Sequence, residues 1–184
     1  MIIRRATTKD VKEIATCMML AMEEIVYKFI GENSTKKALH FLESLIIQKN
    51  NQYSYENCWV IEDNNKVITA ANVYNGADLE KLRIPVALLM KTMFNQKLVY
   101  EKETQSGEYY IDCIGVNPNY QGKGIGSKML QFLIDEYVRK KNETLGLLVD
   151  KNNPNAKKLY LKLGFKVVGK KTLVDKEMEH LQIQ

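Results

Sequence analysis

Residues 109–126 combine the features of a phosphate-binding turn. An apolar stretch typical of a strand ends at Val116, and the alternate glycines Gly122, Gly124 and Gly126 follow it at the start of a helical apolar pattern. Glycine can adopt a left-handed backbone and has no Cβ to obstruct a ligand, and the first N–H groups of a helix have no partner within that helix. Anions bind where such N–H groups cluster. The segment therefore predicts binding of a ligand that carries phosphate groups.

The spacing of these glycines excludes the two most common nucleotide motifs. A dinucleotide-binding fingerprint needs its third glycine three positions after the second, whereas Gly124 and Gly126 are two positions apart. A P-loop needs Lys-Ser or Lys-Thr after its last glycine, and here the order is Ser127-Lys128. Neither class of nucleotide site fits this turn.

The segment instead resembles the acyl-CoA signature of the GNAT N-acetyltransferase superfamily. That signature reads Arg/Gln-x-x-Gly-x-Gly/Ala after a strand ending in Val-x-Pro, and it is matched by Val116-Asn117-Pro118 and by residues 121–126. A second signature of the family, Asn-x-x-Ala-x-x-Leu-Tyr-x-x-x-Gly-Phe, is matched by residues 153–165. The residues alone predict that this second block is a short helix ended by Gly164, with a strand starting at Phe165.

The resemblance implies an enzyme that moves an acetyl group from acetyl-CoA to a primary amine by direct transfer. It implies that the main chain around Gly115 holds the pantetheine and the thioester carbonyl, with this glycine permitting a close approach. Asn153 would contact the pantetheine arm, although an Asn before proline is also a natural turn or cap residue. The implied cofactor-binding residues are Ile114, Gly115, Val116, Gln121, Gly122, Lys123, Gly124, Ile125, Gly126, Ser127, Asn153 and Tyr160.

Two side chains are predicted to be catalytic, Tyr160 and Asp112. Tyr160 matches the family's general acid, and a phenol with a pKa of about 10 suits protonation of a thiolate whose conjugate acid has a pKa of about 8.5. Asp112 is the first candidate for the base, because period two along the strand places it on one face with Ile114 and Val116. A structural hydrogen-bond acceptor explains this aspartate equally well.

Two more carboxylates, Glu103 and Glu108, precede the same strand and are weaker candidates for the base. Exposed loop charge is the better explanation for both. A rival mechanism would use Cys113 as nucleophile with His40 or His180 as base, but alternation with Asp112 predicts that this thiol faces the opposite side of the sheet as inert core.

A noncatalytic acyl-CoA-binding regulatory module is the alternative from another functional class. Retention of Tyr160 favours the enzyme, since a degenerate member of the family could lose this acid. The sequence is compatible with either a small-molecule amine or a protein amine as the acceptor. It is also compatible with a homodimer.

The composition indicates which partners and which cellular compartment to expect for this chain. Its 184 residues carry a net charge of +5, with basic and acidic side chains interleaved rather than clustered among aromatic platforms, so no nucleic-acid partner is expected. Three cysteines without a Cys-x-x-Cys pair favour neither a disulfide framework nor a metal site. No apolar run reaches the roughly 18 residues of a membrane span, so a cytoplasmic protein without a membrane partner is expected.

The alternation of strand and helix patterns predicts an α/β fold. We expect one domain over residues 1–184, with a mixed, mostly antiparallel central sheet of about six to seven strands covered by helices on both faces. The expected strands are 2–4, 58–62, 67–74, 108–116, 144–149, 165–170 and 173–182, and the expected helices are 11–30, 34–48, 124–141 and 155–163.

An insertion at about 75–107 separates the predicted hairpin from the motif strand, where the GNAT family often has a short turn. Its apolar pattern predicts one or two helices, with Pro85 in a first turn. Because the insertion leads directly into the motif strand, it is predicted to be a lid on the acceptor side.

Overall fold

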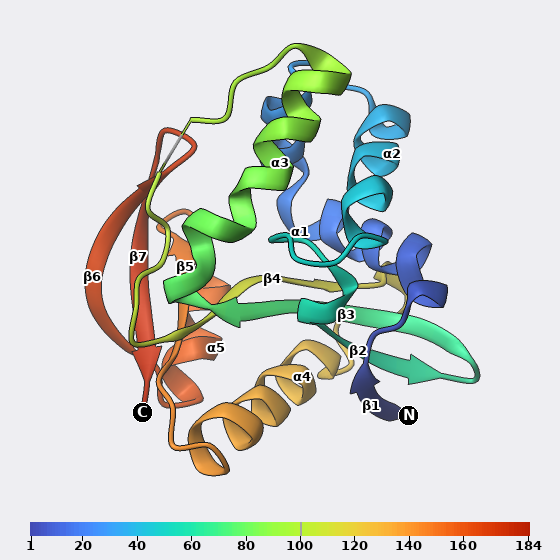
Figure 1. Ribbon diagram of the computed structural model, residues 1–184. Helices are drawn as coiled ribbons and strands as arrows, with labels where there is room; N and C mark the ends of the chain where they lie inside the picture. Colours follow the sequence, from blue (N-terminus) through green and yellow to red (C-terminus); the bar gives the residue numbers. More distant parts are fainter. Residues whose placement is uncertain (100) are drawn as a thin grey trace.

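The computed structural model describes residues 1–99 and 101–184, which form a seven-stranded sheet between two layers of helices (Figure 1). The strand order is β1-β2-β3-β4-β5-β7-β6. Within the described residues only β4 and β5 pair in parallel, and the other neighbours are antiparallel. The predicted fold class is thereby confirmed. The strands are β1 (Ile2–Arg5), β2 (Cys58–Asp63), β3 (Lys66–Asn75), β4 (Tyr109–Val116), β5 (Leu145–Asp150), β6 (Lys166–Leu173) and β7 (Lys176–Ile183).

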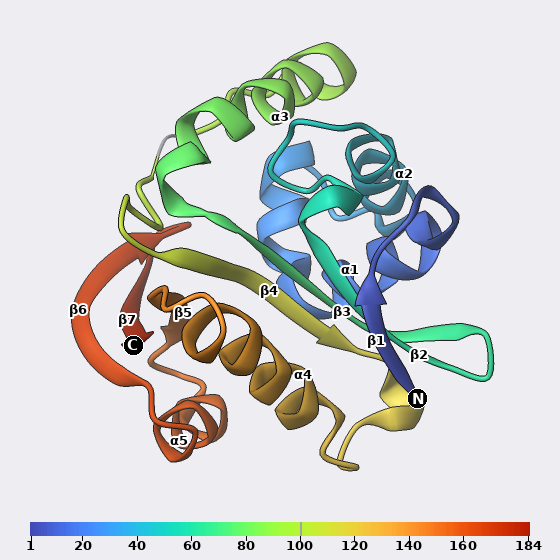
Figure 2. The ribbon, with the colours of Figure 1, turned by 60° about the horizontal axis from the view of Figure 1, so that its bottom comes forward.

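Helices α1, α2 and α3 cover one face of the sheet, and α4 and α5 cover the other (Figures 1 and 2). None of the helices formed by the described residues is long and apolar enough to cross a membrane. A π-helix, Ile134–Arg139, continues α4. The α-helices are α1 (Val11–Ile30), α2 (Thr35–Ile46), α3 (Leu79–Phe94), α4 (Ile125–Leu133) and α5 (Pro154–Lys162), and short 3₁₀ turns occupy Thr8–Asp10, Tyr55–Asn57, Gly76–Asp78 and Pro118–Tyr120.

Local interactions determine where helix α1 begins and ends. The carboxylate of Asp10 accepts a hydrogen bond from the N–H of Thr7 at 2.7 Å, which completes a capping box. At the other end Gly31 adopts a left-handed φ of 73°. The sequence did not predict the interruption at Met22, whose φ of −142° and ψ of 32° are not helical. This break lies beside the cavity described below.

The insertion contains one long α-helix, α3, which agrees with the one or two helices predicted. Pro85 lies at the seventh position of α3, so the prediction that it occupies a first turn is wrong. A proline there removes the hydrogen bond to the carbonyl of Lys81. Since Lys81 is exposed, water can satisfy that carbonyl, and burial of the opposite side of α3 against the first core cluster holds the helix together.

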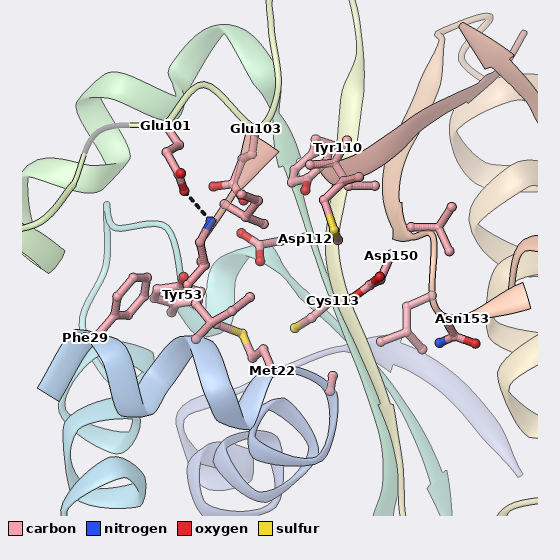
Figure 3. A pocket seen from close by; sticks show the side chains of 18 of the residues that line it. Met22, Phe29, Tyr53, Glu101, Glu103, Tyr110, Asp112, Cys113, Asp150 and Asn153 are labelled. Atoms are coloured by element: carbon pink, nitrogen blue, oxygen red, sulfur yellow. Dashed lines mark hydrogen bonds between the residues drawn. The ribbon is translucent and has the colours of Figure 1, made fainter. Parts of the chain in front are cut away.

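A β-bulge in β4 changes which side chains face which layer. Cys113 pairs with Asn72 and Ile111 pairs with Val73, so Asp112 is the extra residue of the bulge. Cys113 packs in the core cluster under α1, whereas Ile114 and Val116 pack against the cluster under α4. The predicted common face of Asp112, Ile114 and Val116 is therefore wrong. Asp112 and Cys113 instead line the same cavity on the α1 side (Figure 3).

The parallel strands β4 and β5 pair over a short stretch only. Tyr109, Tyr110 and Ile111 are the residues of β4 with partners in β5, and beyond them the strands diverge. On its other edge β4 continues to pair with β3 up to Val116. Within residues 1–99 and 101–184, no strand pairs with this edge of β4 from Asp112 onward, so it can offer main-chain groups to a ligand.

Gly115 lies where α1 touches β4. A Cβ on this glycine would lie 1.8 Å from the carbonyl oxygen of Cys17, so the expected space for a ligand on this side is filled by α1. We expect Gly115→Ala to destabilise the fold by roughly 3 kcal/mol, because backbone of α1 has to move. Urea unfolding measures the change, with Gly169→Ala as the control, since no atom lies within 4 Å of its Cβ position. Equal effects of the two substitutions would contradict tight packing at Gly115.

Candidate active site

A cavity of about 370 Å³ lies where β4 and β5 diverge, and it reaches from α5 to α1 and the insertion. Four residues predicted from the two motifs line it, namely Asp112, Ile114, Asn153 and Tyr160. Figure 3 shows Glu103 and Asp112 together on one side of the cavity and Asn153 on the other. The structure thus brings the candidate base and the candidate acid, which lie far apart in the sequence, to one space.

The glycine turn before α4 has the conformation that the sequence predicts. Gly122 and Gly124 have left-handed φ values of 73° and 74°, and no atom of the described residues lies within 4 Å of their Cβ positions. The backbone is therefore open to a ligand on this side, at the end of α4 where helix N–H groups lack partners.

Neighbouring side chains brace this turn. The amide of Gln121 donates to the carbonyl of Val116 at 3.0 Å, and the ammonium of Lys123 donates to the carbonyl of Asn119 at 2.9 Å. Gly126 packs against Val116, and Ile125 is buried under the sheet, while Ser127 is partly buried. The contacts of these residues with a cofactor stay a prediction.

Tyr160 is positioned by the start and the end of α5. The side chain of Asn153 caps the helix by accepting from the N–H of Ala156 at 3.1 Å, which confirms the cap interpretation of this asparagine. The Tyr160 ring packs edge-on against Phe165, with ring centroids 6.0 Å apart. Burial raises the pKa of Tyr160, so its phenol stays protonated at neutral pH. It is thus suited to donate a proton, as the sequence predicts.

Two carboxylates, Asp112 and Glu103, share one amide group. The nitrogen Nε2 of Gln52 lies 2.7 Å from Oδ2 of Asp112 and 2.9 Å from Oε1 of Glu103. The hydroxyl of Tyr74 also donates to Oδ2 of Asp112 at 2.9 Å. The guanidinium of Arg83 contacts Glu103 at 2.5 Å from the other side.

Burial makes both carboxyl groups easier to protonate. Desolvation, followed by the nearby charge of Asp112, raises the pKa of Glu103 to about 7 even though Arg83 opposes the shift. Desolvation also raises the pKa of Asp112 above its usual range. Ionising both carboxyl groups of a buried pair is unfavourable, because the two negative charges repel each other and have lost their water. Such a pair can therefore bind and release a proton near neutral pH.

The interpretation of Glu103 and Glu108 as exposed loop charges is wrong, because both are buried. Glu108 accepts hydrogen bonds from Thr104, Gln182 and the ring of His180. Burial opposes its ionisation, but these hydrogen bonds outweigh burial and hold the pKa of Glu108 below its usual value. A carboxylate held in this way is a structural acceptor rather than a base.

Cys113 has no activating partner in the described part of the chain. Burial, and then the charge of Asp112, raises the pKa of Cys113 well above its usual value, so the thiol stays protonated. His180 contacts Glu108, and His40 lines a separate hollow between α2 and α3. The geometry therefore gives no support to a cysteine nucleophile.

Sequence reasoning missed three residues of the site, Gln52, Tyr53 and Arg83. Gln52 and Tyr53 belong to an irregular segment with no motif, so nothing in the sequence marked them. Arg83 did leave a signal, because it shares the buried face of α3 with Leu79, Val86 and Met90. A single charge in an apolar helical stripe indicates a buried partner.

Residues 26–165 match the family model described as the Acetyltransferase (GNAT) family. An N-acetyltransferase from Staphylococcus aureus Mu50 has a similar structure, with a TM-score of 0.86 and 26% identity over 100% of both chains. A protein from Salmonella typhimurium, solved with its cofactor acetyl-CoA, has a TM-score of 0.56 at 18% identity over 100% of this chain and 93% of its own. At that identity the second likeness concerns the fold alone.

Among curated relatives, the spermine/spermidine N(1)-acetyltransferase of Bacillus subtilis strain 168 is 34% identical over 71 residues. The alignment covers 38% of this chain and 47% of that relative, so the chain spans about half the length of the relative that it matches.

Proposed function

Because the chain belongs to the GNAT acetyltransferase family, we propose that it transfers the acetyl group of acetyl-CoA directly to a primary amine. The observation that carries the proposal is the cavity between β4 and β5, which joins a buried carboxylate pair to a protonated tyrosine. The reaction needs one proton to leave the ammonium before attack, a second to leave nitrogen as the amide forms, and one to reach the departing thiolate.

The residues present fit acetyl-CoA. The open, left-handed Gly122 and Gly124 precede α4, where a diphosphate can accept hydrogen bonds from helix N–H groups. The free edge of β4 beyond Ile111 can hold the pantetheine arm and the thioester carbonyl through main-chain groups. When bound, acetyl-CoA supplies the activated acetyl group.

The side chains of the cavity supply proton transfer and orientation. The Asp112–Glu103 pair attracts the ammonium of the acceptor and takes one of its protons, which leaves a neutral, nucleophilic amine. The phenol of Tyr160 donates its proton to the sulfur as the carbon–sulfur bond breaks, and the second proton of the attacking nitrogen, lost as the amide forms, restores the phenol. No covalent bond to the protein forms in this scheme.

The lining of the cavity favours a cationic acceptor with an apolar body. Its charged residues are four carboxylates and one guanidinium, although the chain as a whole is basic. Apolar side chains of α1, such as Leu20, Ile25 and Phe29, provide the rest of the wall on that side. A polyamine combines methylene segments with cationic ends, and the spermine/spermidine acetyltransferase among the relatives supports this choice.

The insertion contributes to the same wall. Arg83, Leu98, Val99, Glu101 and Glu103 all line the cavity. Their position supports the proposal that residues 75–107 shape the acceptor side. Three free, buried thiols fit a reducing compartment such as the cytoplasm, where acetyl-CoA is available.

An amine panel tests the proposed function. We would incubate the protein with acetyl-CoA and spermidine, n-hexylamine, phenylethylamine or a peptide with a free N-terminus, and follow free thiol together with the mass of the product. Acetylated amine in a one-to-one ratio with released thiol is the expected result. Tight CoA binding without transfer to any amine would instead indicate the regulatory module.

Gly124→Glu is expected to weaken CoA binding by about 100-fold or more. The substitution places a side chain and a negative charge beside the diphosphate site, and φ of 74° strains any residue other than glycine. Calorimetry with CoA measures the loss. Gly169→Glu in β6 is the control, because its Cβ position is also open but lies outside the turn. Equal CoA affinity of the Gly124 variant and wild type would refute the phosphate site.

A further inference from the structure

We propose that Arg83 is a positioning residue that, together with the amide of Gln52, sets the Asp112–Glu103 pair to take one proton from the acceptor. The inference rests on the proposed acetyl transfer and deepens it. It assigns a role in proton transfer to the insertion, which contributes both Arg83 and Glu103.

The contacts of Arg83 fix its guanidinium from three sides. Nη2 donates to Oε1 of Glu103 at 2.5 Å, and Nη1 donates to the carbonyl of Glu101 at 2.5 Å. Nε donates to Oε1 of Gln52 at 3.4 Å. Only 8% of the Arg83 side chain and 6% of the Glu103 side chain are exposed, so water screens this ion pair poorly.

Gln52 carries the effect of Arg83 to the second carboxylate. Because its oxygen faces the guanidinium, its nitrogen must face the carboxylates, and its two N–H groups reach Glu103 and Asp112. The backbone of Gln52 is itself held by the carbonyl of Leu82 and the amide of Asn72. The three charged side chains are thus joined through one rigid amide.

The charges of these groups show why the pair takes one proton from the acceptor. With both carboxylates ionised, the pair and Arg83 carry a net charge of −1, which one ammonium can balance. When the ammonium gives a proton to the pair, the amine becomes neutral and the pair with Arg83 becomes neutral as well. The total charge of the buried site is unchanged by the transfer, so no charge has to enter or leave a region of low dielectric.

Other titratable groups around the pair do not replace Arg83. Tyr74 of β3, Tyr110 of β4 and Tyr53 of the irregular segment after α2 surround the pair, and burial raises the pKa of each well above its usual value, so they stay neutral. The thiols of Cys58 and Cys113 also stay protonated. Glu101 lies on the same segment and accepts from the N–H of Val174. Among the described residues that contact the pair, Arg83 is the one cation.

Three variants test the inference. Arg83→Met removes the positive charge. The pH at which kcat/KM falls on the acidic side should then rise by about one unit or more. This profile is measured with the panel amine that wild type uses best. Arg83→Lys keeps a charge and should restore most of the wild-type profile. Arg83→Met with Glu103→Gln removes both partners, returns the net charge to −1, and should shift the limb back toward neutral pH.

Infrared difference spectroscopy supplies a readout that does not need turnover, because it separates protonated carboxyl groups from carboxylates. Arg83→Met should keep a carboxyl group of the pair protonated at a pH where wild type has lost that proton. CoA binding and thermal unfolding check that each variant is folded. Lys81→Met, on the exposed side of α3, is the matched control for loss of a positive charge from this helix.

The outcomes separate the two proposals. An active wild type with the same pH profile and the same carboxyl titration in Arg83→Met would overturn the role of Arg83 alone. A wild type that acetylates no amine would overturn the proposed function, and with it the catalytic meaning of this network.

Discussion

Tyr160→Phe is expected to lower kcat by about 100-fold or more while the affinity for CoA stays near that of wild type. The substitution keeps the ring that packs against Phe165 and removes the phenol proton that we propose passes to the departing thiolate. That proton is needed only as the carbon–sulfur bond breaks, so the loss belongs to the transition state and not to ground-state binding.

Steady-state kinetics and CoA calorimetry on the same preparation check this result. Tyr55→Phe is the matched control, since Tyr55 packs against the other core cluster on the far side of the sheet. The acetyl thioester of a CoA analogue with a more acidic thiol should recover part of the lost rate, because a better leaving group depends less on an acid. If kcat were unchanged in Tyr160→Phe, Tyr160 would be a packing residue and water would protonate the thiolate.

The sequence predicted the parts of the site that depend on local geometry. A left-handed turn before a helix requires glycine at fixed positions, and Gly122 and Gly124 meet this requirement in the structure. The cap at Asn153 and the helix that carries Tyr160 follow equally local rules. The order of strands and helices predicted the sheet for the same reason, because hydrophobic periodicity fixes each element separately.

The bulge in β4 shows where such local rules fail. Alternation would have placed Asp112 with Ile114, but pairing of β4 with β3 inserts one extra residue and reverses the alternation beyond it. Register with a neighbouring strand decides this, and the sequence of β4 alone does not contain it. The same bulge brings Asp112 and Cys113 to one side of the sheet.

The carboxylate network was beyond sequence reasoning because its members come from segments distant in the chain. Gln52 meets Arg83 across 31 positions and Asp112 across 60 positions. Glu103 was predicted to be exposed because loops are usually polar and solvated. The segment from Glu101 to Glu103 instead packs between α3 and the β6–β7 turn, where Val174 donates to Glu101.

Asp112→Asn is expected to lower kcat/KM for the amine by about 100- to 10,000-fold, the range for loss of a general base. The amide keeps the size of the side chain and can still bond Tyr74, but it cannot take a proton from the ammonium. In wild type, kcat/KM should fall as the pH drops below about 7, because the raised pKa of Glu103 means that the pair holds a proton there and cannot accept another.

The pH profile distinguishes a base from a binding charge. Glu103→Gln leaves Asp112 as the one carboxylate of the pair, so its acidic limb should move to lower pH as the repulsion from Glu103 disappears. Glu13→Gln on the exposed side of α1 is the control for a lost carboxylate outside the site. If Asp112→Asn raised KM while kcat kept its wild-type value and pH dependence, the carboxylate would only attract the ammonium, and water would have to remove its proton.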